Sequence, residues 1–80
     1  MTAGSKDDLL DAYVGQYVSW QTALFDYRKG DTSLLELKRK TKRVNRWRKS
    51  LLRRGITVKE LDACAVEAAV LLTHYYEQHR

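Results

Sequence analysis

Apolar residues recur with the period of an α-helix along three stretches of the chain, 6–29, 33–54 and 58–78. When successive residues are placed about 100° apart, the apolar side chains of each stretch gather on one side. Proline, the residue that most often ends a helix, is absent from the sequence. The pattern predicts an all-α protein, either a three-helix bundle or a dimer of such hairpins, in a single domain over residues 1–80. Residues 1–4 are expected to form a loose tail.

The first predicted helix has a wider apolar face than one core usually requires. Its apolar and aromatic residues form two neighbouring lines, which together span about half of the circumference. One line contains Leu9, Tyr13, Trp20, Leu24 and Tyr27, with Tyr17 beside it, and the other contains Leu10, Val14, Val18 and Phe25. A helix packed on a single core usually shows a stripe about 100° wide. The excess width favours a homodimer or a docked partner that covers part of this face.

The other two predicted helices have narrower apolar faces. In the second helix the stripe consists of Leu34, Leu37, Thr41, Val44, Leu51 and Leu52. In the third helix the predicted core face consists of Leu61, Cys64, Ala65, Ala68, Leu71, Leu72, Tyr75 and Tyr76. Because the turns between the helices are short and contain glycine, consecutive helices are predicted to be antiparallel neighbours.

The junction between the second and third helices carries the clearest local signal. Gly55 is predicted to end the second helix, since glycine accepts the left-handed conformation that often follows a helix. Thr57 and Glu60 have the spacing of a capping box, in which each side chain binds the backbone amide of the other residue. Ile56 and Leu61 have the spacing of a hydrophobic staple. The third helix is therefore predicted to begin directly after Thr57.

Positive charge is concentrated in one segment of the chain. Residues 34–54 contain ten basic residues and a single carboxylate, Glu36, for a formal charge of +9. The remaining residues contain five basic and nine acidic groups, a formal charge of −4, so that the whole chain carries +5. Ion pairs within the second helix can neutralise little of this charge, because only one acid is present.

Most basic side chains of the second helix lie away from its apolar stripe. Cations spaced along one helix face can displace counterions from nucleic-acid phosphates. The candidate residues for phosphate contacts are Lys38, Arg39, Lys42, Arg43, Arg46, Lys49 and Arg53. We therefore predict a small accessory or regulatory protein that binds DNA or RNA through this helix.

Two other interpretations of the charge remain open. The basic face can dock on an acidic protein surface, which would make the protein an adaptor, an inhibitor or an assembly subunit. Alternatively, it is a solvated face, or one paired with carboxylates of the first and third helices, since runs of charge are usually solvated. A helix-turn-helix reader is disfavoured, because phosphates repel the acids on the outer face of the third helix. Those acids are Glu60, Asp62, Glu67 and Glu77.

Four aromatic residues and one arginine form a second set of candidates, for contacts with a protein partner or a second copy. The set consists of Tyr13, Tyr17, Trp20, Trp47 and Arg48. Tyrosine and tryptophan suit interfaces because they bury a large area and keep a polar tip. The aromatic line is predicted to belong to the core or to an interface, and stacking of nucleic-acid bases on it is the less favoured alternative.

Arg48 is the one basic residue that falls inside the apolar stripe of the second helix. An arginine in that position must either extend along the surface to water or meet a carboxylate. The candidate partners are Asp26, Asp62 and Glu67. The favoured prediction is an ion pair that sets the helix register, and the alternative is a charge presented to a docking partner.

The sequence offers no constellation for catalysis or for a metal or cofactor. His74 and His79, the only histidines, are about 140° apart on a helix and cannot share a metal. Cys64 is the only cysteine and is expected to be an inert core thiol. We predict that the protein is not an enzyme and binds no metal and no cofactor. The lack of a signal peptide and of a membrane span predicts a cytoplasmic protein with no membrane partner.

Overall fold

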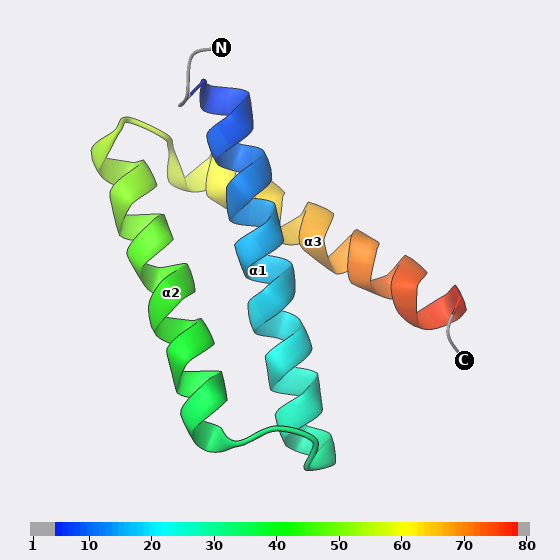
Figure 1. The fold of residues 1–80 in the computed structure, drawn as a ribbon. Coiled ribbons are helices and arrows are strands. Elements are labelled where there is room, and N and C mark those ends of the chain that lie inside the picture. The colour runs from blue at the N-terminus through cyan, green and yellow to red at the C-terminus, as the bar shows by residue number, and fades with distance from the viewer. Residues whose placement is uncertain (1–4, 79–80) are drawn as a thin grey trace.

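The structure, a computed structural model, describes residues 5–78. They form a three-helix bundle of α1 (Lys6–Lys29), α2 (Leu34–Arg53) and α3 (Val58–Gln78) (Figure 1). The predicted all-α fold is confirmed, as are the predicted bounds of the first and third helices. The second helix is one residue shorter at each end than predicted, because the flanking residues act as its caps. The tail predicted at residues 1–4 lies outside the described residues.

Helix α1 is the central element of the bundle. Figure 1 shows α2 running antiparallel beside it, while α3 passes behind α1 and turns away from α2. Both α2 and α3 pack against α1, whereas α2 and α3 make few contacts with each other. The prediction that consecutive helices are neighbours is therefore confirmed for α1 and α2 and wrong for α2 and α3.

The central position of α1 explains its wide apolar face. On the line that faces α2, the Trp20 Nε1–H donates to Thr41 Oγ1 at 2.9 Å. On the line that faces α3, the ring of Phe25 meets that of Tyr76 edge-on, with ring centroids 5.6 Å apart. Each apolar line thus has its own partner helix within the chain, and the width of the face requires no external partner.

The hydrophobic core lies where α1 is covered from both sides. One large side chain from each helix is almost fully enclosed: Tyr13, Leu51 and Leu61 are at most 1% exposed. Towards its C-terminus α3 is supported by α1 alone (Figure 1). Leu71 and Tyr75, predicted to be buried, are 49% and 53% exposed. The prediction is wrong for these two residues because no second helix covers that side of α3.

The turn between α2 and α3 is closed by the predicted local contacts. Gly55 has a φ of 94°, a left-handed conformation, and the Ile56 amide donates to the Leu51 carbonyl at 3.1 Å. The Glu60 amide donates to Thr57 Oγ1 at 3.2 Å, and the Thr57 amide donates to a Glu60 carboxylate oxygen at 3.5 Å. The predicted capping box is confirmed, and it satisfies backbone amides that the first turn of α3 would otherwise leave free.

We expect the substitution Thr57→Ala to destabilise the protein by roughly 1 kcal/mol, the usual cost of a lost N-cap side chain. The change removes the oxygen that accepts from the Glu60 amide. Thermal unfolding followed by circular dichroism measures the loss. Thr73→Ala, at an exposed position inside the same helix, is the matched control and should be neutral or stabilising, because alanine is the best helix former. Equal melting temperatures for Thr57→Ala and the wild type would contradict the cap.

Candidate nucleic-acid interface

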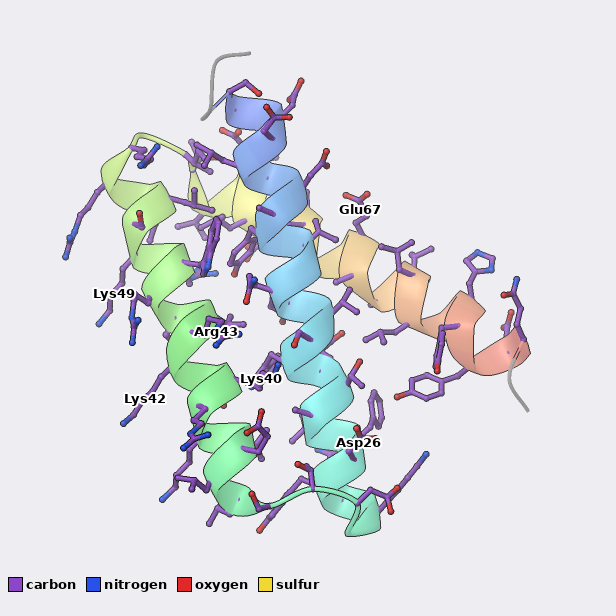
Figure 2. The ribbon with its side chains drawn as sticks, in the orientation of Figure 1. Asp26, Lys40, Lys42, Arg43, Lys49 and Glu67 are labelled. Atoms are coloured by element: carbon purple, nitrogen blue, oxygen red, sulfur yellow. The ribbon has the colours of Figure 1, made fainter. Side chains whose placement is uncertain are left out.

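The outer face of α2 carries a row of basic side chains. Helical spacing places Lys42, Arg46, Lys49 and Arg53 on one side of the helix, and we call this set the basic ridge. The ridge is roughly 16 Å long at a rise of about 1.5 Å per residue. In Figure 2, Lys42 and Lys49 point away from α1. The ridge therefore stands on the side of α2 opposite the bundle core.

All seven residues predicted to contact phosphates are exposed. They are Lys38, Arg39, Lys42, Arg43, Arg46, Lys49 and Arg53. Their exposure follows from the way α2 packs, since it buries Val44 and Leu51 in the core while α3 turns away from it (Figure 1). The structure thus brings the predicted set together on one face, with Arg39 and Arg43 flanking the basic ridge.

Carboxylates leave most of this charge unneutralised. Among residues 5–78, the only ion pairs join Lys6 to Glu60 at 2.6 Å and Arg39 to Glu36 at 3.8 Å. The first pair ties the start of α1 to the start of α3, and its hydrogen bond lowers the pKa of the Glu60 carboxyl. The second pair lies within α2. Pairing of the basic face with acids of α1 and α3, one of the interpretations of the sequence, is therefore contradicted.

Two basic side chains of α2 turn towards α1 instead of solvent. Lys40 Nζ donates to Ser19 Oγ at 2.9 Å, and Figure 2 shows Lys40 between the two helices. Arg48 is half-buried and borders a shallow depression together with Tyr13 and Asn45. Burial raises the pKa of Tyr13, and the neighbouring Arg48 guanidinium opposes this rise. Lys40 and Arg48 therefore help to join α2 to α1 and do not belong to the outer basic face.

The ion pair predicted for Arg48 does not form. No carboxylate among the described residues pairs with it, and in Figure 2 Asp26 and Glu67 lie to the right of α1 whereas α2 lies to its left. The prediction is wrong because α3 turns away from α2, which takes Asp62 and Glu67 out of reach. Arg48 meets the buried Tyr13 instead.

The residues predicted to contact a partner do not form an exposed surface. Tyr13 is buried in the core, and Tyr17, Trp20, Trp47 and Arg48 are only partly exposed. The Tyr17 ring packs against those of Tyr13 and Trp20, with centroid distances of 6.1 and 5.3 Å. The aromatic line therefore serves packing inside the protein, and the prediction of Tyr13 as an interface residue is corrected to a core position.

The sequence prediction did not include two residues that accompany the basic ridge. Asn45 shares a shallow depression with Lys42, Arg46 and Lys49, and its amide adds a neutral hydrogen-bonding group between the cations. Leu35 is 61% exposed and continues the line of the ridge towards the start of α2. Helical angles place Leu35 opposite the apolar stripe of α2 and Asn45 at the edge of that stripe, beside the ridge.

Other reactive groups are few in the part of the chain that the structure describes. Within residues 5–78, no three His, Cys, Asp or Glu side chains lie together in a way that could hold a metal ion. His79 lies outside the described residues. Burial raises the pKa of the Cys64 thiol, and the charges of Glu67, Asp11 and Glu60 raise it further. A thiol in such surroundings stays protonated and is a poor nucleophile.

None of the helices within residues 5–78 is long and apolar enough to cross a membrane. The chain matches no protein-family model, no curated protein and no solved structure. The geometry and charge of α2 therefore carry the functional conclusion.

Proposed function

We propose that this chain is a non-enzymatic accessory or regulatory protein that binds DNA or RNA phosphates through the basic ridge and its flanking residues. The observation that supports this most strongly is the unpaired charge of α2. Seven exposed cations share its outer face, and of these only Arg39 meets a carboxylate within the described residues. This face therefore presents several positive charges that are free to meet an anionic partner.

Nucleic acids match this face in charge, and the basic ridge is long enough to meet more than one phosphate. Phosphates along a strand hold condensed counterions, and cations that replace these counterions release them, which drives binding. Successive phosphates on one strand of duplex DNA are about 3.4 Å apart along the axis. A ridge roughly 16 Å long, from the rise of about 1.5 Å per residue, can therefore reach several phosphates at once. Since its side chains are already exposed, contact requires no rearrangement of the core.

An acidic protein surface is the second candidate partner, and one observation favours it. Leu34 and Leu35, at the start of α2, are 48% and 61% exposed. Exposed apolar side chains beside polar ones are a feature of protein-binding surfaces. In this alternative the protein would be an adaptor, an inhibitor or an assembly subunit.

A cytoplasmic location is part of the same proposal. Cys64 is a free, buried thiol, and free thiols suit the reducing conditions of the cytosol. The nucleic-acid partner would be met in that compartment.

Binding to nucleic acid of unrelated sequence at two salt concentrations separates the two candidates. Fluorescence anisotropy of a labelled duplex and of a labelled single strand should show binding at roughly 50 mM salt that weakens steeply at roughly 200 mM. The logarithm of the association constant should fall linearly with the logarithm of the salt concentration. Each phosphate contact should make this slope steeper by roughly 0.9 for the duplex or 0.7 for the single strand. A surface that recognises only an acidic protein would bind neither probe at low salt, and that result would contradict the proposal.

The double substitution Arg46→Gln with Lys49→Gln should weaken this binding and reduce the salt slope by roughly 1.4 to 1.8, because two phosphate contacts are lost. Helicity should be retained, since glutamine is a comparable helix former. The matched control, Arg28→Gln with Lys29→Gln, removes one arginine and one lysine from exposed positions at the end of α1. It should keep the wild-type slope. If both double variants lost the same affinity and the same salt slope, net charge, and not the basic ridge, would account for binding.

A further inference from the structure

The outer face of α3 carries a regular pattern of its own. Six residues follow one another at spacings of four, three, four, three and four: Lys59, Ala63, Val66, Val70, Thr73 and Glu77. This is the spacing of the a and d positions of a coiled-coil heptad. All six residues are exposed, and the two valines at the centre are 65% and 51% exposed. The face lies about 160° around α3 from the buried Leu61, so that α1 does not cover it.

We propose that this heptad face binds a second copy of the protein, with the two α3 helices packed antiparallel. When the twofold axis passes level with residue 68, Val66 of each copy lies opposite Val70 of the other. Ala63 then lies opposite Thr73, so that small side chains flank the valines and let the helices approach closely. A twofold interface uses the same face on both copies, and this face is complementary to itself only in that arrangement.

The charges at the two ends of the face specify the direction of the partner helix. Lys59 is the only lysine or arginine of α3, and Glu77 is an acid on the same line at the opposite end. In the antiparallel pair, each Lys59 meets Glu77 of the other copy. A parallel pair would bring lysine against lysine and glutamate against glutamate. Charges in facing positions select partner orientation in this way in coiled coils, because like charges are rejected.

The small size of the chain is a second reason to expect a second copy, and not an unrelated helix, on the heptad face; the first is that this face is complementary to itself. A protein of 80 residues buries only roughly 60% of the surface of its unfolded chain. In the dimer, four exposed valines leave water at the centre of one interface, which adds apolar burial that the single chain lacks.

The heptad face is separate from the basic ridge. Helices α2 and α3 make few contacts and lie on different sides of α1 (Figure 1). Pairing through α3 therefore leaves α2 uncovered. The dimer goes beyond the proposed function and does not depend on it.

Charge reversal tests the interface without disturbing the fold. Sedimentation velocity of the whole chain over a concentration series should show a rise in mass from monomer to dimer. K59E and E77K should each raise the dissociation constant of the dimer at least about tenfold, since each places like charges at both ends. The double variant K59E/E77K should restore dimerisation. Each substitution also puts a charge at the end of α3 that its dipole favours, so circular dichroism should remain unchanged and exclude unfolding as the cause.

Two apolar variants locate the interface on α3. Val66→Gln with Val70→Gln should abolish the dimer. Leu71→Gln is the matched control: Leu71 is comparably exposed, at 49%, but it lies on another side of the helix, so its replacement should leave the dimer intact. A chain that stays monomeric over the whole concentration series would overturn the proposal. So would single charge reversals that dimerise as tightly as the wild type, or a Leu71→Gln variant that dissociates as fully as the double valine variant.

Discussion

Replacement of Leu61 by alanine is expected to cost roughly 2–5 kcal/mol of folding stability, the usual range for a buried leucine cut to alanine. Leu61 is 0% exposed and shares the core cluster with Tyr13, Leu51 and Ile56. The lost methyl groups would leave a cavity where side chains of all three helices meet. A domain of 80 residues has a total stability of roughly 4–12 kcal/mol. The expected loss is therefore a large fraction of the total stability.

Urea denaturation followed by circular dichroism measures this change as a shift of the midpoint. Leu35→Ala is the matched control, because it makes the same chemical change at a side chain that is 61% exposed. The control should lie within about 0.5 kcal/mol of the wild type, as surface substitutions usually do. If both variants lose the same stability, Leu61 does not occupy the centre of the core and the placement of α3 on α1 is wrong.

Helix bounds and caps could be predicted from the sequence because they depend on residues close together in the chain. At the start of α3, the Glu60 amide donates to Thr57 Oγ1 at 3.2 Å, across three residues. Gly30, with a φ of 83°, closes α1 by amide contacts to carbonyls of the preceding turn. Such contacts require only the right side chain or backbone freedom at the right spacing. They therefore form in the same way whatever the tertiary arrangement.

Packing partners could not be predicted in the same way. The helical period identifies an apolar face, but it does not identify the helix that covers that face. Leu71 and Leu72 are adjacent members of one predicted stripe, yet they are 49% and 6% exposed. The difference arises because α3 rests on α1 along one line only, with α2 turned away (Figure 1). The direction that α3 takes after Gly55 determines which of its side chains are covered, and no local sequence pattern specifies that direction.

One property of the candidate site could be predicted from the sequence and another could not. Exposure of the basic ridge follows from its angular separation from Val44 and Leu51, which the sequence already contains. The lack of neutralising acids could not be predicted, since it depends on whether Asp62 and Glu67 of α3 can reach α2. Composition shows how much charge the segment carries, and the tertiary arrangement determines how much of that charge is left unpaired.

The substitution Ala68→Leu is expected to loosen α3 from α1 and to cost roughly 1–3 kcal/mol, the usual penalty for extra methylene groups in a packed core. Ala68 is 0% exposed and lies in the core cluster with Val14 and Leu61. A leucine at this position can be accommodated only if α3 moves outward. Because α2 gives α3 little support, such a movement meets resistance from α1 alone.

The neighbouring alanine provides the matched control. Ala69 is exposed and borders a depression next to Phe25 and Tyr76 that is open to solvent. Ala69→Leu therefore adds the same atoms in free space, where they can cover part of the two rings, and should be neutral or slightly stabilising. Thermal unfolding of the two variants side by side measures the difference. A register error of one residue in α3 would reverse the two results, because the added methyl groups would then enter the core from position 69.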